Sequence, residues 1–293
     1  MLNKVKIPVL PKKILIIIIT AALAVLIPFA VYSLRSPVLI LSEESFTALY
    51  GEKRIRKENI RNSIALFRRV LMVKTANDAG EDIIPHAVAE ISSSPYCVLF
   101  PLRFTRSARL YKEQNPGIPV ILLEGRRIET KSEFDFSYKT DIENDFFQAG
   151  IAALELAAGG KIAVFLESSI DRLAREAFLR GIGEEKASEV KFYTNFSHYH
   201  PVNELSCAVL AGIGAEFMEG NVDIPVIYIS WLNPGYVPQN VVMIINDSPL
   251  AQVKEAVRLF SAGEKEGKIR SNFLTVNSKK IDKKILRKIK KIR

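Results

Sequence analysis

The residue types that could recognise a small molecule gather directly after predicted strands, where polar and aromatic side chains follow apolar runs. In α/β proteins the loops after the carboxyl ends of parallel strands line the ligand crevice. Aromatic walls and a few aimed polar groups suit a small-ligand pocket. The candidate ligand-binding residues are Ser42, Glu43, Phe46, Asn77, Asp78, Arg103 and Phe104 in the first half, and Glu167, Ser168, Asp171, Arg175, Asn195, Trp231, Asn233 and Asp247 in the second.

Motifs of the common reactions are missing from the sequence. It has no G-x-S-x-G nucleophile elbow, no G-x-x-x-x-G-K-[ST] phosphate loop and no H-E-x-x-H zinc motif. Asp141, Glu143 and Asp145 provide carboxylates for a metal or for acid and base catalysis, but acidic residues also favour helix starts because they complement the helix dipole. We therefore predict no catalytic residue, no cofactor and no enzymatic activity.

Histidine and cysteine residues give no metal or disulfide site. His198 and His200 lie on one side of an extended segment, but structural zinc requires four ligands and His86 is the only other histidine. Cys97 lies in a strand-like apolar run and Cys207 in a helix-like run, and two cysteines are too few for a disulfide framework. Two buried free thiols and no bound metal are expected.

Short apolar runs alternate with longer segments of helical periodicity, the pattern of a parallel sheet covered by helices. The runs are apolar throughout, as expected where both faces of a sheet are covered. The predicted strands are residues 37–41, 70–74, 96–101, 119–123, 161–166, 190–193, 225–230 and 241–245. The predicted helices are residues 56–69, 82–93, 105–113, 142–158, 170–185, 203–219 and 249–261.

This order of elements divides the chain into halves, separated by a stretch at 126–140 in which no strand is predicted. It predicts the α/β fold class, with two doubly wound parallel-sheet lobes and a cleft between them. Lobe 1 is expected at about 37–140 and lobe 2 at about 141–278, with crossovers. Hinges are expected where the chain crosses between lobes, near 123–127, 138–141 and 230–238.

Three stretches of the domain at 36–278 carry a family pattern. The first is a predicted crossover helix, Asp145 to Leu154, which contains Gly150. The second is a predicted strand, Lys161 to Leu166, followed by a helix from Arg175 to Gly181. The third is a predicted strand and its end, Val241 to Asp247, followed by a helix and a turn at Gly263. The chain thereby resembles the type I periplasmic binding proteins, which include sugar binders and the ligand cores of lactose-repressor-like regulators. The resemblance implies a two-lobed domain that closes on a solute.

Two departures concern the ligand and the shape of lobe 2. Sugar binders of this group commonly place an arginine where this chain has Phe178. The segment after Ser230 is too short for a helix before the next strand. The resemblance therefore implies the fold more strongly than it implies a sugar ligand.

An apolar segment from Ile14 to Leu34 has 21 residues without a charge. As a helix it is about 30 Å long, enough for one bilayer crossing. Four lysines precede it, which favours a cytoplasmic tail at 1–13 and an extracytoplasmic main domain, periplasmic or extracellular. We favour a retained signal anchor over a cleaved signal peptide because the run exceeds a usual signal core. The apolar segment also stands where a lactose-repressor-like regulator has its DNA-binding domain, so no such domain is predicted.

The net charge of +9 belongs to the ends of the chain. Residues 36–278 carry 27 basic and 31 acidic groups, so no nucleic-acid partner is predicted. Residues 279–293 carry nine basic groups around isoleucines at helical spacing, a basic amphipathic helix. Two interpretations stay open, a helix that lies on an anionic membrane and one that packs its isoleucines on the body.

The sequence thus predicts a membrane-anchored extracytoplasmic protein that binds or senses a small-molecule solute, with a transporter or signalling partner of unknown kind. One alternative is a membrane-associated glycosyltransferase-like enzyme, which nucleotide-sugar binding would reveal. The other is a scaffold that has lost its ligand, for which the cleft would be filled by its own side chains.

Overall fold

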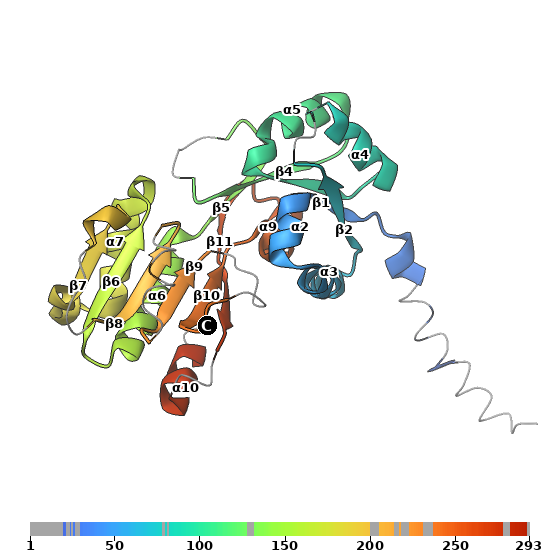
Figure 1. Cartoon of the computed structure of the whole chain (residues 1–293). Helices are drawn as coiled ribbons and strands as arrows, with labels where there is room; N and C mark the ends of the chain where they lie inside the picture. Colours follow the sequence, from blue (N-terminus) through green and yellow to red (C-terminus); the bar gives the residue numbers. More distant parts are fainter. Residues whose placement is uncertain are drawn as a thin grey trace, which may run out of the picture.

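The computed structural model describes residues 20–21, 24, 26, 30–77, 80, 82–127, 132–199, 205–213, 217, 223–230, 237–277 and 282–291. In this part of the chain two α/β lobes lie side by side and meet near strands β5 and β11 (Figure 1). The predicted two-lobed α/β architecture is confirmed.

Lobe 1 is built on a six-stranded sheet with the order β11-β5-β4-β3-β1-β2, and all neighbouring strands are parallel. Its strands are β1 (Val38–Glu43), β2 (Val70–Thr75), β3 (Cys97–Pro101), β4 (Val120–Gly125), β5 (Phe136–Thr140) and β11 (Glu266–Ile269). Its helices are α2 (Glu44–Tyr50), α3 (Glu52–Leu66), α4 (Ile83–Ile91), α5 (Thr105–Gln114) and α9 (Pro249–Ser261).

Strand β1 shows why the runs of lobe 1 are apolar throughout. Alternate side chains of a strand point to opposite faces. Val38 and Ile40 pack in the layer of α3 and α9, whereas Leu39 and Leu41 pack in the layer of α4 and α5. Because both faces are covered, every residue of β1 is buried.

Lobe 2 has a second six-stranded sheet with the order β12-β10-β9-β8-β6-β7, in which only β12 is antiparallel to its neighbour. Its strands are β6 (Lys161–Leu166), β7 (Val190–Tyr193), β8 (Leu205–Ala211), β9 (Val226–Ile229), β10 (Val241–Asn246) and β12 (Asn272–Thr275). Its helices are α6 (Ile142–Ala157), α7 (Asp171–Ile182) and α10 (Lys283–Lys291).

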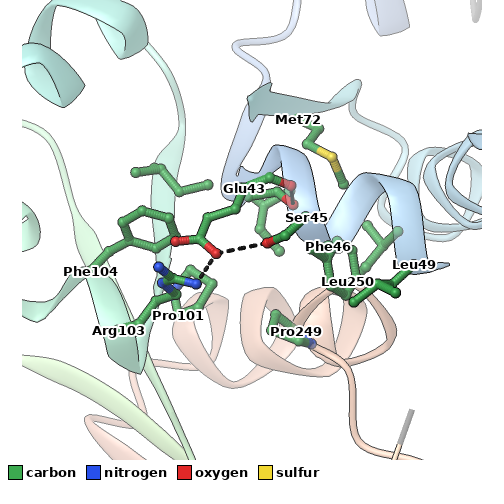
Figure 2. Close-up of a pocket in the computed structure, with 13 residues that line it drawn as sticks. Glu43, Ser45, Phe46, Leu49, Met72, Pro101, Arg103, Phe104, Pro249 and Leu250 are labelled. Carbon is green, nitrogen blue, oxygen red and sulfur yellow. Dashed lines mark hydrogen bonds and ion pairs between the residues drawn. The ribbon is translucent and has the colours of Figure 1, made fainter. Parts of the chain in front are cut away.

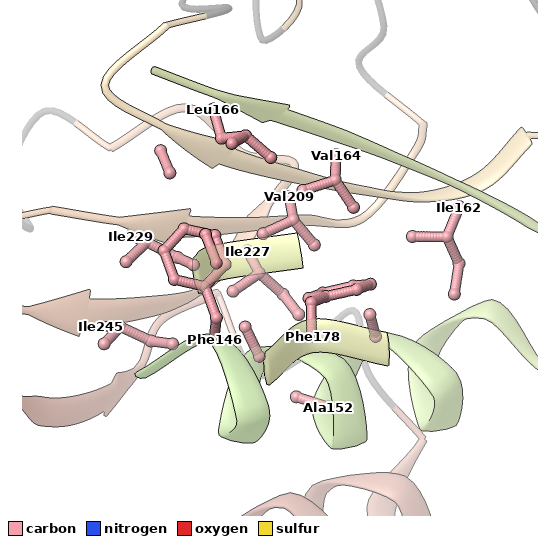
Figure 3. Close-up of a cluster of buried hydrophobic side chains, with 14 of the residues drawn as sticks. Phe146, Ala152, Ile162, Val164, Leu166, Phe178, Val209, Ile227, Ile229 and Ile245 are labelled. Atoms are coloured by element: carbon pink, nitrogen blue, oxygen red, sulfur yellow. The ribbon is translucent and has the colours of Figure 1, made fainter. Parts of the chain in front are cut away.

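The core of lobe 2 lies between the sheet and helices α6 and α7, where Phe146 and Phe178 pack against Val164, Val209 and Ile227 (Figure 3). Figure 3 shows both rings beneath the strands. On the opposite face of the sheet, aromatic rings gather around Phe165. The members of that aromatic cluster are Tyr193, Phe196, Tyr199 and Phe217.

Helices α6 and α7 approach closely at two glycines. A Cβ atom added to Gly150 would lie 2.4 Å from the carbonyl oxygen of Phe178, and one added to Gly181 would lie 2.2 Å from that of Phe147. Only hydrogen fits at these positions, since real Cβ atoms do not approach a backbone oxygen so closely. The glycine that the sequence places in this crossover helix is therefore required for packing.

The chain passes between the lobes three times, from β5 to α6, from β10 to α9 and from β11 to β12. The hinge predicted at 138–141 is the first crossing. The hinges predicted near 123–127 and 230–238 are wrong, because those segments join β4 to β5 within lobe 1 and β9 to β10 within lobe 2. As a result α9 and β11 belong to lobe 1, although they follow the strands of lobe 2 in the sequence.

Two of the crossings are bonded to each other. The backbone N–H of Asp141 donates to the carbonyl of Ile269 at 2.8 Å. The buried carboxylate of Asp145 accepts from the backbone N–H of Ser271 at 3.3 Å and from its hydroxyl at 2.5 Å. Burial raises the pKa of Asp145 from 3.8 to about 7, although the bonds from Ser271 oppose the rise.

Several predicted elements need correction. The helix at 203–219 is wrong because Leu205–Ala211 forms β8, a central strand, so Cys207 lies in a strand. The stretch 126–140 is not strandless, since it contains β5, and strands β11 and β12 were not predicted. Both cysteines are buried and free as expected, and burial raises the pKa of both thiols.

At the N-terminus, most of the predicted anchor from Ile14 to Leu34 lies outside the described residues. Among the residues that are described, no helix combines the length and the apolar character needed for a membrane crossing. At the C-terminus, α10 is the predicted amphipathic helix. Its Ile285 and Ile289 pack on the core of lobe 2, and Lys288 pairs with Glu155 at 2.9 Å.

Candidate functional site

A cleft of about 740 Å³ lies between the lobes, lined by the segments that follow β3 and β4 in lobe 1 and β6 and β9 in lobe 2. The β10 to α9 crossing forms part of its wall through Asp247 and Pro249. This is the position expected for a ligand site in parallel sheets, at the carboxyl ends of the strands. Its volume lies within the range of about 300–1,000 Å³ typical of small-molecule sites.

Arg126 links the two lobes across the cleft. It follows β4 of lobe 1, and its Nη2 atom donates to the carbonyl of Ile229 at 2.7 Å and pairs with Oδ2 of Asp247 at 2.9 Å. The Oδ1 atom of Asp247 is buried and has no hydrogen-bond partner in the described structure. The cleft therefore contains one carboxylate oxygen that a ligand donor could satisfy.

A smaller cavity of about 210 Å³ opens beside the cleft in lobe 1 and is called here the Glu43 pocket (Figure 2). It shares Pro101, Arg103 and Pro249 with the cleft. The residues that line it are Ile40, Leu41, Ser42, Glu43, Ser45, Phe46, Leu49, Met72, Pro101, Arg103, Phe104, Pro249 and Leu250. Most of these side chains are apolar, so the pocket is an apolar recess with charged groups at one end.

The charged end of the Glu43 pocket is fixed by the local structure. Glu43 is the last residue of β1 and immediately precedes α2, and its backbone carbonyl accepts from the hydroxyl of Thr47. Its carboxylate accepts from the hydroxyl of Ser45 at 3.1 Å and pairs with Arg103. Figure 2 shows Arg103 and Glu43 pointing toward one another beside Phe104.

The predicted candidates that line one of the two cavities come mainly from lobe 1. They are Ser42, Glu43, Phe46, Arg103 and Phe104 in the Glu43 pocket, Glu167 and Asp247 in the cleft, with Arg103 in both. Asn77 lies next to the pocket, where its side-chain oxygen accepts from the backbone N–H of Ser45 at 2.9 Å. Asp78, Trp231 and Asn233 lie outside the described residues.

The remaining candidates of lobe 2 line neither cavity, and their polar groups serve local structure. Asp171 pairs with Arg175 at 2.7 Å within α7, and the guanidinium of Arg175 lies 4.3 Å from the ring centre of Phe192. Asn195 accepts from the backbone N–H of Ser197 at 3.0 Å. Ser168 is the first residue of a short 3-10 helix, Ser168–Ile170. The second residue of this helix, Ser169, lines the cleft instead.

The acidic residues at the start of α6 and the Phe178 position also take structural roles. Asp141 caps α6 by accepting from the backbone N–H of Asn144 at 3.1 Å, and Glu143 pairs with Lys268 at 2.9 Å. Phe178 is fully buried in the core of lobe 2, so an arginine there would not face the cleft. The described residues contain no group of three or more His, Cys, Asp or Glu side chains placed to hold a metal.

Sequence reasoning missed six polar residues that line the cleft, Glu124, Arg126, Arg127, Ser169, Ser230 and Gln252. The first three follow from the rule that ligands meet the ends of parallel strands, because Glu124 is the next-to-last residue of strand β4 and both arginines come directly after the strand. Gln252 lies on α9, and its amide donates to the hydroxyl of Thr140 at 2.8 Å. No local signal in the sequence places α9 at the cleft.

Comparison with solved structures supports the fold. A transcriptional activator of the comK gene from Bacillus halodurans aligns with a TM-score of 0.58 and 14% identity over 87% of this chain and 95% of its own. A periplasmic solute-binding protein of an ABC transporter from Actinobacillus succinogenes, with bound D-allose, aligns with a TM-score of 0.53 and 12% identity. The alignment covers 84% of this chain and 99% of that protein. A solute-binding protein from Agrobacterium vitis with bound allitol aligns with a TM-score of 0.50 and 11% identity, over 88% of this chain and 99% of that protein.

At these identities the likeness concerns the fold alone. The expected resemblance to type I periplasmic binding proteins is confirmed at that level. No protein-family model matches the sequence, and no curated protein matches it.

Proposed function

We propose that this protein is a membrane-anchored, extracytoplasmic solute-binding or sensing protein whose two lobes close on a small molecule. The observation that carries the proposal is the cleft of about 740 Å³, which both lobes line at the carboxyl ends of their strands. Within the described residues, three backbone crossings join the lobes, so a hinge motion can change the width of the cleft without disturbing either core.

The polar groups of the cleft suit binding better than catalysis. Asp247 has a free buried oxygen, and Arg126 already connects the lobes through Asp247 and Ile229. A ligand that donates a hydrogen bond to Asp247 adds a further link between the lobes and favours the closed state. The bound D-allose and allitol of two proteins with this fold support a small polar ligand.

The membrane anchor rests on the sequence. Ile14 to Leu34 is uncharged and follows four lysines. Protease added to cells whose outer membrane, where present, has been removed should degrade the domain at 36–278 and spare a tag at residue 1. A tag and domain that are both protected would refute this orientation.

Ligand binding is tested by a thermal-shift screen of the full chain with sugars, nucleosides and amino acids, followed by small-angle scattering. A true ligand should raise the melting temperature and reduce the radius of gyration. Asp247→Asn should weaken its binding about tenfold or more, because a charge-assisted hydrogen bond contributes about 1.5–3 kcal/mol. Asp223→Asn, an exposed change in the same lobe, should leave the affinity unchanged. Equal affinities in both variants would contradict the role of Asp247.

A scaffold without a ligand is the second candidate. It is favoured by the charges of the site that already pair with one another, Arg126 with Asp247 and Arg103 with Glu43. In that case the whole screen should leave the melting temperature and the radius of gyration unchanged.

A further inference from the structure

The ion pair at the end of the Glu43 pocket is strongly unequal in its exposure to water. The side chain of Glu43 is 5% exposed, whereas that of Arg103 is 57% exposed. Glu43 is held at the end of a central strand, β1, while Arg103 lies on a three-residue 3-10 helix, Leu102–Phe104. The carboxylate is therefore the fixed member of the pair and the guanidinium is the replaceable one.

This inequality decides which charge a ligand can bring. An anionic ligand that took Arg103 would leave the carboxylate of Glu43 buried and unpaired, which is strongly unfavourable. A cationic ligand that took Glu43 would release Arg103, whose guanidinium is already largely in water and also borders the cleft. Exchange of one cation for another keeps the buried charge neutralised, so the site favours a cation.

The rest of the Glu43 pocket determines the other end of the ligand. Phe46, Leu49 and Leu250 lie at the end of the drawn pocket opposite Arg103 (Figure 2). At about 210 Å³ the pocket is smaller than the sites of about 300–1,000 Å³ that enclose whole ligands. It therefore holds one apolar group of a ligand, with the Phe104 ring next to the charged end, where an aromatic face attracts a cation.

We infer that the Glu43 pocket takes a small amine with an apolar group, whose ammonium replaces the guanidinium of Arg103 on Glu43 while the apolar group fills the recess. This inference rests on the proposed function, since it names the ligand class for the pocket that adjoins the solute-binding cleft. It also assigns a role to Arg103, which occupies the ammonium position when no ligand is bound. The ligand class differs from the neutral polyols bound by proteins of the same fold.

The test uses 2-phenylethylamine as the probe, with calorimetry on the full chain in zwitterionic nanodiscs. Three matched compounds separate the contributions. 2-Phenylethanol lacks the charge, 3-phenylpropionate reverses it, and ethanolamine lacks the apolar group. Each should bind about tenfold more weakly or worse than the amine, from the loss of a charge-assisted hydrogen bond or of the buried ring. Tighter binding of 3-phenylpropionate would overturn the inference and make Arg103 the ligand-binding group.

Two variants make the result specific to the ion pair. Glu43→Gln should weaken amine binding about tenfold or more, whereas Arg103→Ala should strengthen it because the internal competitor is gone. The matched controls are Glu133→Gln and Arg109→Ala, which alter a second Arg–Glu pair of lobe 1, joined at 2.5 Å and outside both cavities. Weaker amine binding in Arg103→Ala, or unchanged binding in Glu43→Gln, would refute the replacement.

The outcomes also distinguish this inference from the proposed function. Scattering on the same samples reports whether the lobes close. If a compound without an amine closes the lobes in an Asp247-dependent way while amines do not bind, the ligand class is wrong and the solute-binding function stands. If amines bind with the predicted variant pattern but no compound closes the lobes, the ligand class is right and the hinged function is wrong.

Discussion

Replacement of Asp145 with asparagine should make this protein more stable near neutral pH. The carboxylate of Asp145 is buried where α6 meets the crossing at Ser271, and burial raises its pKa from 3.8 to about 7. In the unfolded chain the pKa returns to its ordinary value. One pKa unit corresponds to about 1.36 kcal/mol, so the difference between the folded and unfolded pKa of Asp145 amounts to about 4 kcal/mol of unfolding free energy.

The direction of the pH dependence follows from proton binding by Asp145 in the folded and unfolded chain. Between about pH 4 and pH 7 the folded protein holds a proton on Asp145 that the unfolded chain has lost. Stability from this group is therefore fully present below pH 3.8 and is lost as the pH rises through about 7. Asparagine does not titrate, and its amide can accept from the backbone N–H of Ser271 and donate to its hydroxyl, so Asp145→Asn should keep the contact and remove this pH dependence.

The assay is urea denaturation of both proteins at pH 4.5, 6.0 and 7.5, followed by circular dichroism. The free energy of unfolding of the variant, relative to the natural chain, should increase by about 3 kcal/mol between pH 4.5 and pH 7.5, the part of the total that falls within this range. Asp135→Asn is the control, because Asp135 is exposed and its pKa is lowered by pairing with Lys112. Parallel curves for the natural chain and Asp145→Asn would show that Asp145 is ionised throughout and would refute the reasoning.

Two further predictions concern packing in lobe 2. Gly150→Ala should lower stability by about 1–3 kcal/mol, because its Cβ would lie 2.4 Å from the Phe178 carbonyl, whereas Gly117→Ala has nothing within 4 Å and should be nearly neutral in the same thermal melts. Ile289→Ala should lower the free energy of unfolding by about 2 kcal/mol or more, because it removes a side chain that packs α10 on the core. Lys288→Ala removes an exposed ion pair and should lower it by less than about 1 kcal/mol. Equal melting temperatures within either pair would contradict these contacts.

The sequence was informative where a strand is buried on both faces. Runs such as Lys161–Leu166 and the helix Pro249–Ser261 have the predicted bounds, because long apolar runs and helical periodicity are local signals. Leu205–Ala211 was mistaken for a helix since small apolar residues fit either structure. Phe136–Thr140 and Glu266–Ile269 were missed because they mix polar and apolar residues. They are strands through their pairing in the sheet, Phe136–Thr140 with β4 and β11 and Glu266–Ile269 with β5.

The candidate site divides in the same way. Glu43 and Asp247 were found because they lie at the carboxyl ends of apolar runs, a rule that depends only on the neighbouring residues. Leu250 and Gln252 reach the site from α9, whose return to lobe 1 is a property of the topology. Arg126 was overlooked although it also follows a strand, and its role appears only when Asp247 is seen beside it.

The late return of α9 and β11 to lobe 1 has a consequence for synthesis and for the export that the proposed location requires. The layer of Val38 and Ile40 is covered only in part, by α3, until Leu250, Val253 and Val257 of α9 have been made. A growing chain of this topology cannot complete its first lobe early, because the closing pieces come from its last quarter. A polypeptide that must be threaded through a membrane in an extended form benefits from this delay, since premature folding would block its passage.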